Sequence, residues 1–227
     1  MIIKNQEKIM TGRRQFIKKV AYFISLFGFL VSPLFSMIRW TRAEAKKRIL
    51  PKGTKRGELI KRNPDHLDTR NLEITPLKDF ETMGLTEYQV DTDTWRLEVT
   101  GYVGNPSKLS FDQITALPSI ERTVLLICPG VFANHGHWKG ISIKYLLETV
   151  KMEDGITHVT VRGPKGVYEH KVRFPIKDIL SDKVFLAYQV NNESLPVKHG
   201  FPLRVVAEGY YGFDWVKYVF NIEAEKI

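Results

Sequence analysis

A succession of short segments with strand periodicity, running from Trp95 to Ile222, is the feature that most constrains the fold of this chain. Apolar residues at 95, 97 and 99 alternate with polar ones, which is typical of a strand with one buried face. Similar patterns predict strands over 95–100, 122–127, 158–162, 168–173, 184–190, 203–206 and 215–222, and short helices over 110–117, 143–150 and 175–180. Asn191-Asn192 predicts a hairpin turn. These elements predict a single α+β domain of mixed, mostly β architecture.

The formal net charge of +9 is unevenly distributed along the 227 residues. Residues 1–62 contain sixteen Lys and Arg and three acidic residues, whereas residues 63–227 contain 18 basic and 22 acidic residues. The body of the protein is therefore mildly acidic, and we expect no nucleic-acid partner for it.

The basic N-terminal segment has the layout of an export signal. A twin-arginine pattern stands at Arg13-Arg14, and an apolar run follows over residues 20–38. Residues 43–45 have the small-x-small pattern of a cleavage site, but the apolar run is also close to the length that spans a bilayer. Cleavage and retention as an anchor therefore both remain open, and a random basic patch ahead of a membrane helix is the simpler alternative.

These features divide the chain into three parts. We predict a twin-arginine signal or membrane anchor over residues 1–45, a basic linker over residues 46–71, and the functional domain over residues 72–227. The predicted location is periplasmic or otherwise extracytoplasmic.

The single cysteine, Cys128, follows a predicted buried strand and enters a glycine-containing segment, residues 128–140, which we interpret as a loop. One cysteine excludes a disulfide framework and a multi-cysteine metal cluster. Three alternatives remain: an inert core residue, a nucleophile with His135 or His137 as its base, and a thiolate ligand of a metal. The two histidines lack a nearby third ligand for zinc.

Three separated motifs resemble the sulfite oxidase family of molybdopterin enzymes. They are Cys128-Pro129-Gly130 with Trp138-Lys139-Gly140 and Leu146-Leu147, the stretch Val184 to Pro196, and His199-Gly200-Phe201-Pro202-Leu203-Arg204 followed by Gly209 to Lys217. The resemblance covers residues 72–225 and is strongest over 122–147 and 184–222. It implies the sulfite-oxidase-type molybdopterin-binding fold.

The resemblance also implies a mononuclear molybdenum held by one molybdopterin, with Cys128 as its protein ligand. A thiolate is a soft ligand that suits such a metal. The implied reaction is oxygen-atom transfer, in which molybdenum cycles between Mo(VI) and Mo(IV). The implied cofactor contacts are His199, Arg204, Gly212, Trp215, Val216 and Lys217. Among these, the guanidinium and the ammonium suit the terminal phosphate.

Other site residues are weaker hypotheses. Tyr210 and Tyr211 would lie at the mouth of the metal pocket, where a phenol could bond substrate, although ordinary packing is an equal alternative. His135, His137 and Asp214 are candidates for proton transfer. We interpret Trp138 as a core residue.

The chain also departs from the family. The arginines that attract sulfite are absent after Cys128, so the substrate stays open among sulfite, a sulfoxide and another oxo donor or acceptor. Residues 80–84 replace a loop that helps to hold the pterin, and we assign no contacts there. The sequence has no Cys-x-x-Cys-His haem motif. The expected electron partner is therefore a separate c-type cytochrome or a membrane haem or quinone protein, and we expect a monomer. Two alternative functions remain: a catalytically silent binding or assembly module, and a metal-free Cys-His thiol enzyme.

Overall fold

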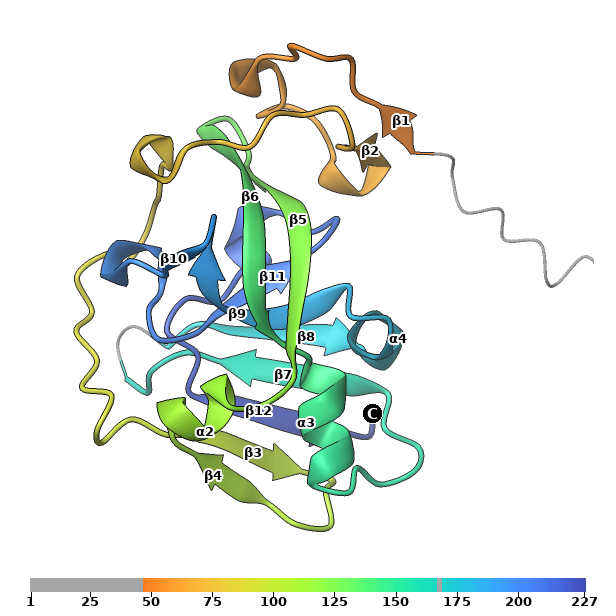
Figure 1. Cartoon of the computed structure of the whole chain (residues 1–227). Coiled ribbons are helices and arrows are strands. Elements are labelled where there is room, and N and C mark those ends of the chain that lie inside the picture. The colour runs from red at the N-terminus through yellow and green to blue at the C-terminus, as the bar shows by residue number, and fades with distance from the viewer. Residues whose placement is uncertain (1–46, 167–168) are drawn as a thin grey trace, which may run out of the picture. The chain divides into compact units, whose positions relative to one another are not determined.

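The computed structural model describes residues 47–166 and 169–227 (Figure 1). One five-stranded antiparallel sheet contains β5 (Ser119–Cys128), β6 (Phe132–Ile141), β9 (Val184–Val190), β10 (Glu193–Ser194) and β11 (Arg204–Ala207). The second contains β3 (Leu97–Gly101), β4 (Ser107–Leu109), β7 (His158–Arg162), β8 (Lys171–Pro175) and β12 (Asn221–Glu225), with β12 parallel to β3. The fold is mostly β, and the predicted fold class is confirmed.

In the described part of the chain, three short helices accompany the sheets: α2 (Phe111–Thr115), α3 (Ile143–Thr149) and α4 (Ile176–Leu180). Ser110 closes a capping box with Gln113 at the start of α2, and Ser142 accepts a hydrogen bond from the Tyr145 amide at the start of α3. The helices and both sheets contribute side chains to the main hydrophobic core. The predicted turn at residues 191–192 has positive φ at both asparagines and connects β9 to β10.

The prediction of a loop over residues 128–140 is wrong, because most of this segment is β6. β5 and β6 form a long hairpin that pairs Ser119 with Ile141 at one end and Cys128 with Phe132 at the other. The glycines that suggest a loop allow close packing instead: a Cβ atom at residue 140 would lie 1.8 Å from the Leu186 carbonyl oxygen, and one at residue 136 would lie 2.9 Å from the Phe80 ring.

The strand predicted over residues 215–222 is much shorter and displaced. Only Asn221–Glu225 forms β12. A 3-10 helix, η5 (Gly212–Asp214), precedes Trp215, and Tyr218 has a φ of 58°, which interrupts an extended backbone. The remaining 3-10 helices are η1 (Arg56–Glu58), η2 (Pro64–His66), η3 (Leu77–Asp79) and η4 (Val197–His199).

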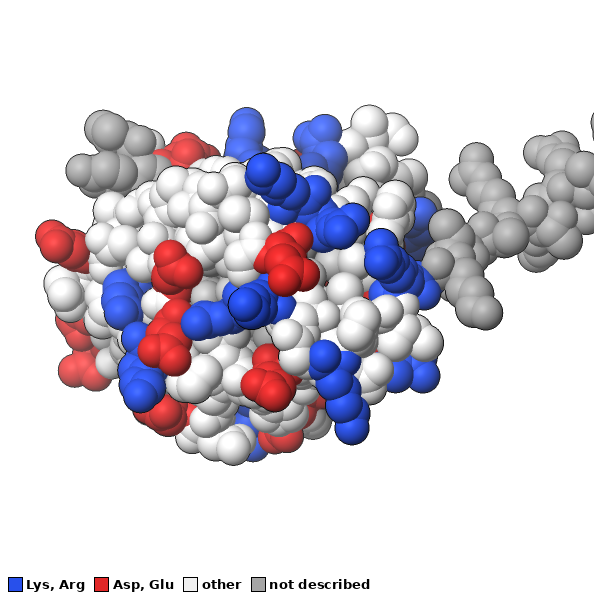
Figure 2. Space-filling view, turned by 90° about the horizontal axis from the view of Figure 1, so that it is seen from above, with Lys and Arg blue, Asp and Glu red and all other residues white. Residues whose placement is uncertain are grey.

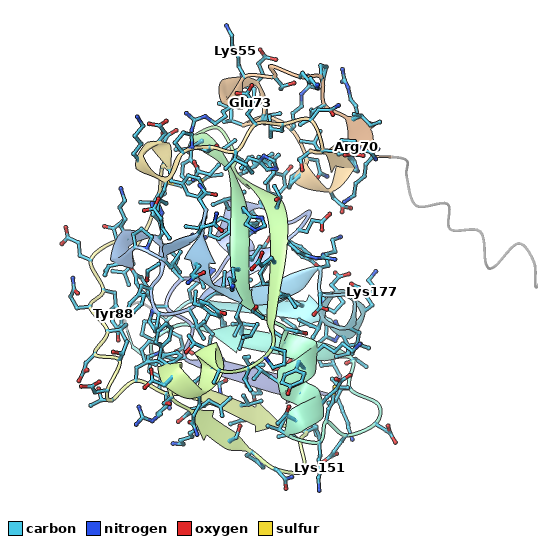
Figure 3. All side chains as sticks on the ribbon, viewed as in Figure 1. Lys55, Arg70, Glu73, Tyr88, Lys151 and Lys177 are labelled. Carbon is cyan, nitrogen blue, oxygen red and sulfur yellow. The ribbon has the colours of Figure 1, made fainter. Side chains whose placement is uncertain are left out.

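Residues 47–71, which the sequence suggests as linker, pack onto the domain. The short parallel strands β1 (Arg48–Ile49) and β2 (Leu67–Asp68) pair there. Four leucines, at positions 50, 59, 67 and 72, are buried against Leu125, Ile127 and Ala133 of the β5–β6 hairpin. Their spacing is irregular and matches neither a helix nor a strand period. The basic, glycine-containing sequence around them therefore predicts a linker and not this apolar contact. Figure 3 labels Lys55 and Arg70 in this segment and Glu73 just after it. Seen from above in Figure 2, basic and acidic side chains are interspersed on the surface.

The predicted signal and the apolar run over residues 20–38 lie outside the described residues. Within the described part of the chain, no helix combines the length and apolar character needed to span a membrane.

Candidate functional site

A cavity of about 440 Å³ opens where β5 ends at Cys128. The antiparallel register places Cys128 opposite Phe132 and on the same face of the hairpin as Leu126, because side chains alternate along a strand. The cavity is lined by Glu81, Thr82, Met83, Gly84, Leu85, Leu126, Cys128, Phe132, Glu169, His170, Arg204, Gly212, Phe213, Trp215, Lys217 and Tyr218. Five of the predicted site residues therefore line the same cavity: Cys128, Arg204, Gly212, Trp215 and Lys217.

Arg204 places a buried positive charge in this cavity. Its side chain is 4% exposed, and its guanidinium stacks over the rings of Trp138 and Trp215, with 5.1 and 5.4 Å to the ring centroids. The guanidinium donates to the His199 carbonyl oxygen at 2.9 Å, but no carboxylate pairs with it among the described residues. Burial lowers the pKa of Arg204 to about 10, so it stays charged at neutral pH.

Lys217 adds a second charge beside the first. An isolated antiparallel bridge pairs Arg204 with Lys217, so both side chains leave the same face. The Lys217 ammonium donates to Thr82 Oγ1 and to the Met83 carbonyl oxygen, both at 3.1 Å. Burial, together with the nearby Arg204, lowers its pKa to about 8.

His199 lies buried next to this pair. Burial and the neighbouring cations lower its pKa to about 4, so the imidazole is neutral at neutral pH. Its Nε2 atom is buried and has no hydrogen-bond partner among the described residues, although its ring packs edge-on against Phe80 at 5.7 Å. The two cations, Arg204 and Lys217, repel each other and have no acidic partner among the described residues, so this end of the cavity is chemically suited to an anion.

The Cys128 end has different chemistry. The thiol is free and buried, and burial raises its pKa, so a cation would be needed to keep it as a thiolate. In the described part of the chain, no three His, Cys, Asp or Glu side chains are grouped to hold a metal. Gly212 lies directly on this end: a Cβ atom there would be 3.1 Å from Leu126 Cδ1 and 3.6 Å from Cys128 Cα. The cavity therefore contains one soft sulfur ligand, Cys128, and, separately from it, the two cations Arg204 and Lys217.

Four predicted site residues do not line the cavity: His199, which is buried beside Arg204, and Tyr210, Tyr211 and Val216. The Tyr210 hydroxyl donates to Asp178, and its ring packs on Phe174. Tyr211 packs against the cluster formed by the four leucines of residues 50–72 with Leu125 and Ile127, on the face of β5 opposite Cys128. The side chain of Val216 is buried in the core, and its amide and carbonyl groups bond Asp214 and Val205 within the protein.

The proposed proton-transfer residues also lie elsewhere. His135 and His137 are on the face of β6 opposite Cys128, because they pair with Leu125 and Thr123. His135 is buried against residues 73–75, and burial lowers its pKa. His137 contacts Glu121 at the surface at 3.2 Å. Burial raises the pKa of Asp214, which lies in η5 next to the cavity wall.

Several lining residues could not be found from the motifs. Residues 81–85 form one wall, and the side-chain amide of Asn134 holds them by donating to the Glu81 carbonyl oxygen at 2.8 Å and accepting from the Glu81 amide at 3.2 Å. His170 and Phe213 form part of another wall. Only the position of residues 80–84 in the family pattern pointed to this role. His170 has no local sequence signal.

Comparison with known proteins identifies the family of this chain. The family described as oxidoreductase molybdopterin binding domain matches residues 83–226. The chain is 29% identical over 181 residues to mitochondrial sulfite oxidase of Rattus norvegicus, which covers 67% of this chain and 33% of that protein. It is 25% identical over 178 residues to the protein-methionine-sulfoxide reductase catalytic subunit MsrP of Gluconobacter oxydans, covering 68% of this chain and 56% of that protein.

A solved structure shares the fold. The sulfane dehydrogenase SoxCD from Paracoccus pantotrophus superposes with a TM-score of 0.59 at 19% identity, over 81% of this chain and 51% of that chain. The chain thus spans between a third and just over half of the length of these three proteins. Because the family match covers residues 83–226, more than half of the chain, the chain belongs to the oxidoreductase molybdopterin binding domain family.

Proposed function

We propose that this protein is an exported molybdenum-molybdopterin oxidoreductase that catalyses oxygen-atom transfer, with Cys128 as the protein ligand to molybdenum. The observation that carries the proposal is the sharing of one cavity by the Cys128 thiol and the Arg204–Lys217 pair. A cofactor with a soft metal at one end and a phosphate at the other matches both.

The residues present fit this cofactor on physical grounds. Arg204 is a buried cation without a described carboxylate partner, and such a charge is costly unless an anion compensates it. His199 stays a predicted contact of the pterin: its buried Nε2 has no described partner, although its side chain does not line the cavity. The close approach of Gly212 to Cys128 leaves the wall free of a side chain at that point.

Each residue then has a separate task. When bound, the cofactor would supply oxygen-atom transfer at molybdenum, with two electrons exchanged one at a time with the redox partner. Arg204 and Lys217 would bind the phosphate, and the two tryptophans that stack on Arg204 would fix its guanidinium. Lys217 also bonds the segment over residues 82–83, so cofactor binding and the shape of this wall are linked.

The wall next to Cys128 favours an uncharged organic substrate over sulfite. Leu126, Phe132 and Phe213 line the cavity there, and Phe213 is 63% exposed at its mouth. Of the basic lining residues, Arg204 and Lys217 are assigned to the cofactor, which leaves His170. We therefore infer that an organic sulfoxide is a better substrate than an inorganic oxyanion.

The cellular setting of the proposal comes from the sequence. The twin-arginine pattern supports export to the periplasm or another extracytoplasmic site, and residues 20–38 could anchor the protein in the inner membrane. Electrons would pass to or from a separate c-type cytochrome or a membrane haem or quinone protein, and the protein would act as a monomer.

The metal-free thiol enzyme is disfavoured by the register of the hairpin. His135 and His137 lie on the face of β6 opposite Cys128, so neither can accept its proton directly. The silent binding module keeps the same cavity and is separated from the proposal by experiment.

The test is metal and pterin analysis of protein purified from a host that makes molybdopterin, followed by a sulfoxide and sulfite assay with an artificial electron carrier. We expect molybdenum and pterin in equal amounts, a visible absorption band, and loss of activity after growth on tungstate. Folded protein without molybdenum and pterin would contradict the proposal. Bound cofactor without turnover of any oxo substrate would favour the binding module.

A further inference from the structure

The turn that lies on Cys128 is contacted from its outer side by a histidine. η5 follows Tyr211, which forms an isolated parallel bridge to Ile127, and Gly212 packs onto the end of β5. On the other side, His170 Nε2 lies 2.7 Å from the Phe213 carbonyl oxygen. His170, Phe213 and Cys128 all line the same cavity.

The tip of this turn is little buried, although Trp215 directly after it is 2% exposed. Phe213 is the tip of η5 and is 63% exposed, and no side chain of the described residues donates to the Asp214 carboxylate. The amides of Asp214 and Trp215 bond Tyr211 and Gly212, so these bonds fix the shape of the turn but not its position against the opposite wall.

His170 is itself well anchored. Its carbonyl oxygen accepts from the Gly163 amide at 2.7 Å, just after β7, and β8 begins at the next residue. The imidazole therefore belongs to the second sheet, whereas η5 is attached to β5 of the first. The bond from His170 to Phe213 joins the two sheets at the mouth of the cavity.

We propose that His170 is a positioning residue, which holds η5 over Cys128 by donating from Nε2 to the Phe213 carbonyl oxygen. A carbonyl oxygen only accepts, so Nε2 carries the proton. In this role His170 touches no reacting atom.

The test compares two substitutions at residue 170 with a matched control. His170→Leu removes the donor, His170→Gln keeps an amide donor, and His158→Leu changes a half-buried histidine of β7 that bonds Thr157 outside the cavity. The first measurement is the alkylation rate of Cys128 by iodoacetamide in cofactor-free full-length protein. The second is kcat and KM of the molybdenum-loaded enzyme with an organic sulfoxide, and this arm alone rests on the proposed function.

We expect His170→Leu to raise the alkylation rate of Cys128 by about two- to tenfold, which is the range set by one hydrogen bond. KM should rise within the same range, and kcat should fall by a smaller factor. His170→Gln should stay within about twofold of the unaltered protein, and His158→Leu should leave both measurements unchanged. Equal behaviour of His170→Leu and His170→Gln, or no change in alkylation with His170→Leu, would overturn the proposal. If the loaded enzyme fails to turn over, the alkylation arm still decides the role of His170.

Discussion

The two faces of the β5–β6 hairpin carry similar residue types but have different surroundings. One face presents Cys128 and Leu126 to a cavity that also contains Arg204. The other presents Leu125 and His135 to the leucines of residues 47–72, which fill the space with apolar packing. A strand alternates its side chains, so one residue of register separates a site from a core.

The comparison shows why polar residues in one segment need not share a function. Cys128, His135 and His137 lie within ten residues, and only the first faces the cavity. His199, Arg204 and Lys217 come from later parts of the chain but meet around the cavity because η4, β11 and the segment after η5 converge there.

The largest expected effect separates the two faces directly. Cys128→Ser should abolish turnover while most of the pterin stays bound, because the substitution leaves Arg204 and Lys217 unchanged. His135→Gln and His137→Gln should leave kcat within about twofold, since neither side chain reaches the cavity. Steady-state kinetics of the three variants with an organic sulfoxide measure this difference. Loss of turnover in His137→Gln with the cofactor retained would contradict it.

The next effect concerns the buried cation. Arg204→Met should weaken cofactor retention by about 30- to 5000-fold, the range for removing one member of a buried charge pair. The same variant should not destabilise the cofactor-free protein, because it removes a buried charge that lacks a described partner. Pterin content after gel filtration and urea unfolding of the cofactor-free protein measure the two results. A strong loss of stability without cofactor would show that Arg204 is structural.

The pH dependence of stability should again reflect both faces. The pKa of His199 falls to about 4 in the folded protein, so the unfolded chain binds more protons between about pH 6.5 and 4. The free energy of unfolding should therefore fall as pH falls through this window, by about 3 kcal/mol at pH 4. His135, whose pKa is also lowered by burial, adds to the effect in the same direction. His199→Gln should flatten most of the slope measured by urea unfolding of the cofactor-free protein, and an unchanged slope would contradict this assignment.

A smaller effect is expected from Lys217 and inorganic phosphate. The pKa of Lys217 is about 8 without an anion, and a bound anion should raise it, so binding takes up a proton near this pH. Phosphate affinity should fall about tenfold between pH 7 and pH 9, as measured by the rise in Tm of the cofactor-free protein with phosphate concentration. Lys217→Met should remove this pH dependence. Equal affinity at both pH values would place the anion elsewhere.

The smallest effect belongs to the surface of the opposite face. Glu121 contacts His137 at 3.2 Å and Lys139 at 3.1 Å, and both contacts are partly exposed. Glu121→Gln should leave the urea midpoint of unfolding nearly unchanged and leave cofactor retention unchanged, because exposed ion pairs add little stability. Urea unfolding and pterin content check both parts, and a drop in pterin content would link this surface to the cavity.

The sequence predicts those features that depend on local pattern. Strand periodicity placed β7 and β9, and capping residues placed α2. The family resemblance named His199, Arg204 and Lys217, of which Arg204 and Lys217 line the cavity. It did not predict β6, because Gly136 and Gly140 suggest a loop although their role is to admit Phe80 and the backbone of β9.

The rest of the site depends on tertiary contacts that have no local signal. Residues 81–85 reach the cavity because Asn134 and Lys217 bond them, and His170 reaches it from the β7–β8 connection. Tyr210 lies next to glycine in a plausible motif, but its hydroxyl bonds Asp178 outside the cavity. Which of these side chains face the cavity is set by packing between the two sheets, and this packing leaves no local pattern in the sequence.

The central claim is that Cys128 supplies the sulfur ligand from the protein to molybdenum. The most direct measurement is X-ray absorption at the molybdenum edge of the purified enzyme and of its Cys128→Ser variant. The account predicts one sulfur neighbour fewer around molybdenum in the variant. The same number of sulfur neighbours in both proteins would contradict it.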